Sequence, residues 1–221
     1  LHYEVAEDGD IRDACDLYGP NKWPAEPPGF AAAVTAYWHA CDTVADRLLK
    51  LMAVPLGVQP SWLADLFESP LTNMTLLHYP PQEHGGFGIH PHKDTDALTI
   101  LAGDEVAGLM VRCRDSDEWI DADPPADALV VNIGDMLELW SGGYFVSTPH
   151  KVVNRNGEER YSFPYFAVPR HDVVVEPLRA PQTDFARDSV HVGDVSREVW
   201  RTNWPDAAPL DTGYDLGTLE D

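Results

Sequence analysis

The sequence His90-Pro91-His92-Lys93-Asp94-Thr95-Asp96-Ala97-Leu98-Thr99-Ile100-Leu101 places potential metal ligands directly before an apolar strand. In an extended chain, residues two apart point to the same face. His92 and Asp94 can therefore direct an imidazole and a carboxylate at one point. A third ligand must come from elsewhere, and we expect His150, which opens a predicted strand over residues 150–153.

Two histidines and one carboxylate on one face of an iron ion form the facial triad of non-haem Fe(II) oxygenases, which leaves coordination positions open. A bare His-x-Asp pattern also occurs by chance, and His90 is a rival ligand because it shares the face of His92. Zinc binds the same residue types, but no general base for a zinc hydrolase stands beside the ligands. We expect the remaining histidines to be surface or core residues: His2, His39, His78, His84, His171 and His191.

A second pair of polar residues lies ten positions beyond His150. Arg160 and Ser162 share a strand face, and a guanidinium fork with a hydroxyl suits a carboxylate that must be held in one orientation. Taken alone, this pair is weak evidence for a binding site, and a surface salt bridge is the more common arrangement. Its position after His150 favours a ligand-binding role.

The composition narrows the class of protein. The chain has 221 residues, and its 15 Lys and Arg against 37 Asp and Glu give a net charge of −22. This balance argues against nucleic-acid or anionic-membrane partners. No run of eighteen apolar residues predicts a membrane span. Three scattered cysteines (Cys15, Cys41 and Cys113) predict a reducing compartment, which we take to be the cytoplasm, and no disulfide framework.

The chain reads as a single structural domain with three regions. Residues 1–70 form an N-terminal loop and helical support, which we expect to be trimmed because the chain opens on Leu1 without an initiator Met. Residues 71–170 form a β-rich catalytic core. Residues 171–221 form an irregular and helical tail that we expect to close the pocket.

Periodicity predicts the main elements of these regions. Apolar residues at three- and four-residue steps predict a helix over 30–52, and Ser61 is a candidate N-cap for a helix over 61–67. A further helical stretch lies at 195–201. Several short predicted strands indicate an antiparallel sandwich or jelly roll. These strands cover residues 71–79, 97–102, 108–112, 128–133 and 161–168.

Six motifs in this order resemble the Fe(II)- and 2-oxoglutarate-dependent dioxygenases, specifically the isopenicillin N synthase-like family. The resemblance covers about residues 17–170. The matching segments are Leu77-His78-Tyr79-Pro80-Pro81, His92 to Thr99, Val131-Asn132-Ile133-Gly134-Asp135, Trp140-Ser141-Gly142-Gly143, His150-Lys151-Val152-Val153-Asn154 and Arg160-Tyr161-Ser162.

The resemblance implies a mostly β fold with flanking helices, a distorted double-stranded β-helix (jelly roll) braced by the long N-terminal helix. It implies Fe(II) bound by His92, Asp94 and His150, with 2-oxoglutarate and O2 as cosubstrates. Carried over by position, Arg160, Ser162 and Tyr79 would bind the distal carboxylate of 2-oxoglutarate. No catalytic residue beyond the metal ligands is implied, and His90 would lie behind the ligands or line the pocket.

The implied activity is oxidation of a C–H bond of a small molecule by hydroxylation, desaturation or cyclisation, with release of succinate and CO2, in secondary metabolism. The alternatives are an iron-dependent oxidase of the same fold that does not use 2-oxoglutarate, and a non-catalytic metal- or ligand-binding jelly roll. The plant-type pattern has Asn where this chain has Leu77, although Asn73 lies on the same strand face. Candidate substrate-binding residues near the motif ends are Trp23, Met74, Phe87, Phe166 and Arg170.

Overall fold

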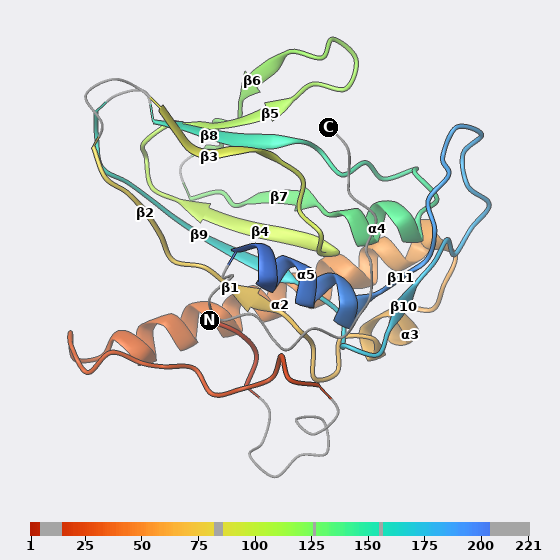
Figure 1. Ribbon diagram of the computed structural model, residues 1–221, viewed down its shortest axis with the longest axis horizontal. Helices are drawn as coiled ribbons and strands as arrows, with labels where there is room; N and C mark the ends of the chain where they lie inside the picture. The colour runs from red at the N-terminus through yellow and green to blue at the C-terminus, as the bar shows by residue number, and fades with distance from the viewer. Residues whose placement is uncertain (5–14, 82–85, 126, 155–156, 204–221) are drawn as a thin grey trace.

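The computed structural model describes residues 1–4, 15–81, 86–125, 127–154 and 157–203 (Figure 1). The helices are α2 (Phe30–Leu56), α3 (Pro60–Asp65), α4 (Asp135–Trp140) and α5 (Val192–Asn203). The strands are β1 (Asn73–Met74), β2 (Leu77–Tyr79), β3 (Gly86–His92), β4 (Leu98–Gly103), β5 (Leu109–Arg112), β6 (Trp119–Asp121), β7 (Val130–Ile133), β8 (His150–Asn154), β9 (Arg160–Ala167), β10 (Val174–Val175) and β11 (Val190–His191).

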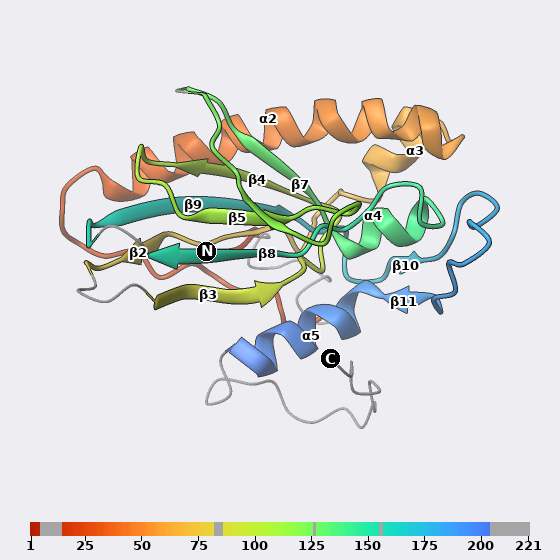
Figure 2. The ribbon, with the colours of Figure 1, turned by 90° about the horizontal axis from the view of Figure 1, so that it is seen from above.

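Two antiparallel sheets form the body of the fold. Sheet A has the order β1-β9-β4-β7, with β2 also paired to β9, and sheet B has the order β3-β8-β5-β6. Figure 1 shows sheet B above sheet A and α2 beneath sheet A. Figure 2 shows α2 running alongside the strands for most of their length. This arrangement confirms the predicted jelly roll braced by a long N-terminal helix.

The strand register decides which residues of sheet A face the helix and which face sheet B. Tyr165 of β9 packs against Trp38 of α2, with ring centroids 5.5 Å apart, and its hydroxyl donates to Asp42 Oδ1 at 2.5 Å. Alternation along the strand then turns Phe166, and Thr99 opposite it on β4, toward the space between the sheets. The same alternation gives that inner face of β9 the residues Arg160, Ser162, Pro164 and Phe166.

The fold has a large core and a small one. The large core lies between sheet A and the helices and includes Leu49 of α2, Ile100 of β4 and Leu137 of α4. The small core lies between the two sheets and is built from Tyr79, Leu109 and Val152. The space between the sheets is therefore apolar where Tyr79 of sheet A meets Leu109 and Val152 of sheet B.

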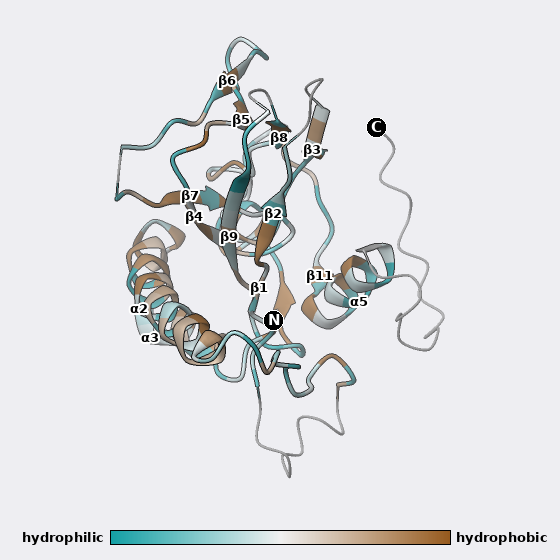
Figure 3. Cartoon of the chain, turned by 90° about the vertical axis from the view of Figure 1, so that its left-hand side faces the viewer, coloured by the Kyte–Doolittle hydropathy of each residue, from teal (hydrophilic) through white to brown (hydrophobic). Residues whose placement is uncertain are grey.

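Helix α2 buries one stripe of its surface and exposes the other. Its buried residues are Cys41, Ala45, Leu49, Ala53 and Leu56, which recur at three- and four-residue steps. Hydrophobic and hydrophilic residues accordingly alternate around the helix in Figure 3. The helix ends at Gly57, whose φ of 76° is left-handed and whose N–H caps the carbonyls of the last turn.

The helix boundaries differ from the predicted ones in two places. Helix α2 extends four residues beyond the predicted end and includes Pro55. Helix α3 begins at Pro60, with Gln59 in the N-cap position instead of Ser61, because a proline at the first helical position has a preset φ and needs no N–H partner. The predicted helix at 195–201 is confirmed as part of α5, which starts three residues earlier.

The strands predicted over 97–102, 108–112, 128–133 and 161–168 are present with shifts of one or two residues at their ends. The segment 71–79 forms two short strands instead of one. The strand predicted over 150–153 is present as β8. Strands β3, β6, β10 and β11 and helix α4 were not predicted. Every residue of α4 after Asp135 is buried, so its sequence carries no amphipathic period. Within the described part of the chain, no helix is long and apolar enough to cross a membrane.

We expect Leu49→Ala and Leu51→Ala to differ sharply in stability although both lie on α2. Leu49 is 3% exposed in the large core, so its truncation should lower the free energy of unfolding by about 2–5 kcal/mol. Leu51 is 67% exposed, and its truncation should change that free energy by no more than about 0.5 kcal/mol. Urea denaturation followed by circular dichroism measures both. Equal effects would contradict the assignment of the buried face.

Candidate metal centre

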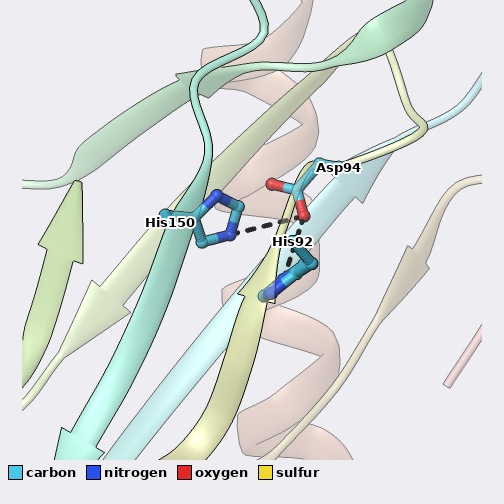
Figure 4. Close-up of side chains that lie close together, drawn as sticks. All are labelled: His92, Asp94 and His150. Carbon is cyan, nitrogen blue, oxygen red and sulfur yellow. Dashed lines mark ion pairs between the residues drawn. The ribbon is translucent and has the colours of Figure 1, made fainter. Parts of the chain in front are cut away.

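Pairing of β3 with β8 brings the two candidate histidines together. His92, the last residue of β3, is the cross-strand partner of His150, the first residue of β8, and their ring centroids lie 4.3 Å apart. Asp94 follows two residues after His92. Its Oδ1 lies 3.7 Å from His92 Nε2 and 3.6 Å from His150 Nε2, and Figure 4 shows the three side chains pointing toward one another.

Backbone carbonyls fix the tautomers of both imidazoles. His92 Nδ1 lies 2.8 Å from the carbonyl oxygen of His90, and His150 Nδ1 lies 3.1 Å from that of Thr148. Because a carbonyl can only accept, both Nδ1 atoms carry the hydrogen and both Nε2 atoms present a lone pair. Burial lowers the pKa of His92, which favours the neutral, metal-binding form. His90 thus acts on His92 through its backbone.

The carboxylate of Asp94 is held by two donors on sheet A. Its Oδ2 accepts hydrogen bonds from Thr99 Oγ1 at 2.6 Å and from Asn132 Nδ2 at 2.8 Å. Thr99 on β4 and Asn132 on β7 are themselves cross-strand partners, so they reach the same oxygen from one face. These bonds leave Oδ1 free to face the two Nε2 atoms. One oxygen and two nitrogen lone pairs converge there, and all three ligand atoms lie within 4.8 Å of one another.

A second carboxyl group, Asp96, lies behind this arrangement. Its Oδ2 is 2.9 Å from Thr99 Oγ1, and the residue is 2% exposed. Burial raises the pKa of Asp96 well above its usual range, and the negative charge of Asp94 raises it further. A neutral Asp96 can donate to Thr99 while Thr99 donates to Asp94. No role was predicted for Asp96, although its spacing of two from Asp94 was a signal for a shared face.

A second group of polar side chains, Arg160, Ser162 and Tyr79, lies on the same inner face of sheet A and is called the Arg160 cluster below. Arg160 and Ser162 of β9 are opposite Tyr79 and Leu77 of β2, and all face the space between the sheets. The Arg160 guanidinium lies 5.0 Å from the centroid of the Tyr79 ring, and its Nε donates to the carbonyl of Val106 at 3.2 Å. These contacts place a cation deep in the fold, with Arg160 only 5% exposed.

Two polar atoms of this cluster lack a hydrogen-bond partner within the described part of the chain. Arg160 Nη1 and the Tyr79 hydroxyl are buried and have no hydrogen-bond partner among the described residues. An unpaired buried donor costs free energy, and native proteins rarely leave one unmatched. A guanidinium and a hydroxyl on one face are suited to an anionic acceptor such as a carboxylate. The free donors therefore mark a place for such a group.

Of the five candidate substrate residues, Phe166 faces the space between the sheets. Its cross-strand partners are Thr99 on β4 and Asn73 on β1, which share that face. Met74 is the cross-strand partner of Tyr165, so it packs in the large core on the α2 side at 1% exposure. Asn73, one residue earlier, faces inward together with Leu77, as predicted from their even spacing.

The other three candidates lie outside the space between the sheets. Trp23 packs against Phe30 at the start of α2. Phe87 is 49% exposed and lies 5.7 Å from the Lys151 ammonium, with neither residue in the small core between the sheets. Arg170 Nε donates to Asp172 Oδ1 at 2.6 Å, so its charge is already paired. Their nearness to motifs in sequence did not bring them to the site.

The remaining histidines lie apart from the metal-ligand cluster, as far as the structure describes them. His78 pairs with Glu159 at 2.8 Å and stacks on Tyr161, on the face of sheet A away from the site. His2, His39, His171 and His191 also lie outside the cluster of His92, Asp94 and His150. His84 lies outside the described residues.

Comparisons with known proteins agree with this geometry. Residues 71–169 match the family described as the 2OG-Fe(II) oxygenase superfamily. The chain is 38% identical over 156 residues to the 2-oxoglutarate-Fe(II) type oxidoreductase hxnY of Emericella nidulans, which is 67% of this chain and 45% of that protein. It spans about half the length of the curated relatives it matches.

Solved structures share the fold. A full-length Neurospora crassa protein in complex with alpha-KG superimposes with a TM-score of 0.76 at 25% identity, over 90% of this chain and 63% of that one. JOX2 in complex with 2OG, Fe and JA gives a TM-score of 0.72 at 27% identity, over 84% of this chain and 56% of that one. The matched family region contains both the metal-ligand cluster and the Arg160 cluster, and the chain belongs to the 2OG-Fe(II) oxygenase superfamily.

Proposed function

We propose that this chain carries the active site of an Fe(II)- and 2-oxoglutarate-dependent oxygenase that oxidises a C–H bond of a small molecule. The observation that carries the proposal is the convergence of His92 Nε2, His150 Nε2 and Asp94 Oδ1 on one point. Two neutral imidazoles and one carboxylate form the donor set of facial-triad iron sites, and their ligand atoms are close enough together to share one ion.

The Arg160 cluster fits 2-oxoglutarate as the cosubstrate. Arg160 Nη1 and the Tyr79 hydroxyl are free buried donors, and Ser162 adds a hydroxyl on the same face of β9. These three residues would hold the distal carboxylate of the keto acid. With both groups bound, iron and 2-oxoglutarate supply the oxidation, in which O2 and the keto acid yield succinate, CO2 and the oxidised substrate.

The protein residues orient the reactants and exclude water. Thr99 and Asn132 hold Asp94 so that one oxygen is available to the metal. The small core of Tyr79, Leu109 and Val152 lines part of the space between the sheets with apolar side chains. Because the chemistry belongs to the metal and cosubstrate, no protein nucleophile is required.

The finer expectations remain part of the proposal. The oxidation is hydroxylation, desaturation or ring closure of a small molecule in secondary metabolism, with Phe166 as the candidate that faces the site. The cytoplasm remains the proposed compartment, supported by the free cysteines Cys15, Cys41 and Cys113. The 2-oxoglutarate requirement is tested by incubating the Fe(II)-loaded protein with 2-oxoglutarate, O2 and a library of small molecules. We expect substrate-dependent succinate release. Product formed without succinate would instead support the oxidase alternative.

We expect His92→Ala to abolish tight binding of Fe(II) and of Mn(II), used as a redox-stable probe, because it removes one of three ligands. Isothermal titration calorimetry on the metal-free protein should show the dissociation constant rising at least about 100-fold. The control is His78→Ala, which removes an exposed histidine paired with Glu159 and should leave metal binding unchanged. Wild-type affinity in His92→Ala would refute the proposed ligand set.

We expect Arg160→Met to weaken 2-oxoglutarate binding with little effect on metal binding. A hydrogen bond to a charged group contributes about 1.5–3 kcal/mol, so loss of this contact should raise the dissociation constant by about 10- to 150-fold. The measurement is titration of the Mn(II)-loaded protein with 2-oxoglutarate.

The matched control for Arg160→Met is Arg112→Met, which removes a surface guanidinium paired with Asp117. It should bind 2-oxoglutarate as the wild type does. If both variants lose affinity equally, a general effect of charge would explain the loss, and the assignment of Arg160 would be wrong.

A further inference from the structure

The short helix α4 carries a buried carboxylate, Glu138, that has no part in the proposed ligand set. The residue is 8% exposed although it is ionisable. Buried carboxylates are costly unless they are paired and hydrogen-bonded. The residues that pair with the Glu138 carboxylate therefore indicate its structural role.

Glu138 contacts both segments that carry metal ligands. Its Oε1 accepts a hydrogen bond from the backbone N–H of Ser147 at 3.0 Å, three residues before His150. Its Oε2 lies 3.6 Å from the ammonium of Lys93, the residue between His92 and Asp94. A single side chain thus joins the turn that bears two ligands to the loop that leads to the third.

A third segment closes the network from the C-terminal side. Arg187 Nη1 pairs with Glu138 Oε2 at 2.9 Å, and Arg187 Nη2 pairs with Asp135 Oδ2 at 3.3 Å. The Asp135 N–H in turn donates to the carbonyl of Asp94 at 2.8 Å. Two cations, Lys93 and Arg187, face two carboxylates, Asp135 and Glu138, so the network is balanced in charge around the ligand-bearing turn.

We propose that Glu138 is a positioning residue that sets the separation of the His92–Asp94 turn and the His150 segment, with Arg187 holding its carboxylate in place. The hydrogen bond from the buried Ser147 N–H is the strongest link. Lys93 and Arg187 are 39% and 34% exposed, so solvent partly screens both ion pairs, and Arg187 is the nearer of the two cations. This inference rests on the proposed function, because it concerns the same metal site.

The test compares metal binding by Glu138→Ala and Glu138→Gln. Residues that orient metal ligands typically change affinity 10- to 100-fold when replaced, so Glu138→Ala should raise the Mn(II) dissociation constant at least about tenfold. Glu138→Gln keeps an acceptor for the Ser147 N–H but loses the charge opposite Arg187, and should recover part of the loss. The visible absorption bands of the Co(II)-loaded protein should shift in Glu138→Ala, because the ligand geometry changes.

The control variant is Asp194→Ala, which removes a partly buried carboxylate paired with Arg197 on α5. It should leave the Mn(II) affinity and the Co(II) spectrum unchanged even if it lowers the thermal unfolding temperature. Circular dichroism of each metal-free variant shows whether it folds. If Glu138→Ala does not fold, the affinity and Co(II) spectrum of Glu138→Gln decide the question.

The outcomes separate this inference from the proposed function. Wild-type protein that binds neither Mn(II) nor Co(II) would refute the metal site itself. Wild-type protein that binds them, with folded Glu138 variants of unchanged affinity and spectrum, would overturn the positioning role alone.

Discussion

The pairing of β3 with β8 is the constraint on which the candidate site depends. Ile89 pairs with Val152 and His92 with His150, so β3 advances three residues while β8 advances two. The extra residue is a bulge, and it lets Ile89 and His92 face the same side although their spacing is odd. In regular alternation Ile89 would enter the small core while His92 pointed outward, and no metal site would form.

Sheet A provides the residues that hold Asp94 and the candidate residues for carboxylate binding. Its inner face places Thr99 and Asn132 behind Asp94, and it places Arg160 and Ser162 toward the opposite end of β9. Its outer face is committed to α2, through contacts such as Tyr165 with Trp38. Two-residue alternation separates these roles. The outer face of sheet A packs against α2 and stabilises the fold, and the inner face carries the polar groups of the site.

Features of the fold and site that depend on residues close in sequence could be predicted from the sequence, and features that depend on contacts between distant segments could not. The His-x-Asp pair and α2 are local, so spacing and a period near 3.6 residues revealed them. The substrate candidates Met74 and Phe87 lie near the motifs in sequence, but a single step of alternation separates Met74 from the inward-facing Asn73. The bulge in β3 depends on its partner strand, and α4 is buried on all sides. Neither the bulge nor α4 produces a periodic pattern in the sequence. The position of Glu138 therefore could not be predicted, and its proposed role rests on its contacts in the structure.

The net charge of −22 bears differently on the surface and on the site. A dianion such as 2-oxoglutarate meets an unfavourable outer field, but the Debye length is about 8 Å at physiological ionic strength, so exposed carboxylates act over short distances. Arg160 is 5% exposed and is screened much less. Near the metal ligands, Lys93 and Arg187 are offset by Asp135 and Glu138. Arg160 and a bound divalent cation therefore provide the positive potential in the interior, and the surface acidity has little direct influence there.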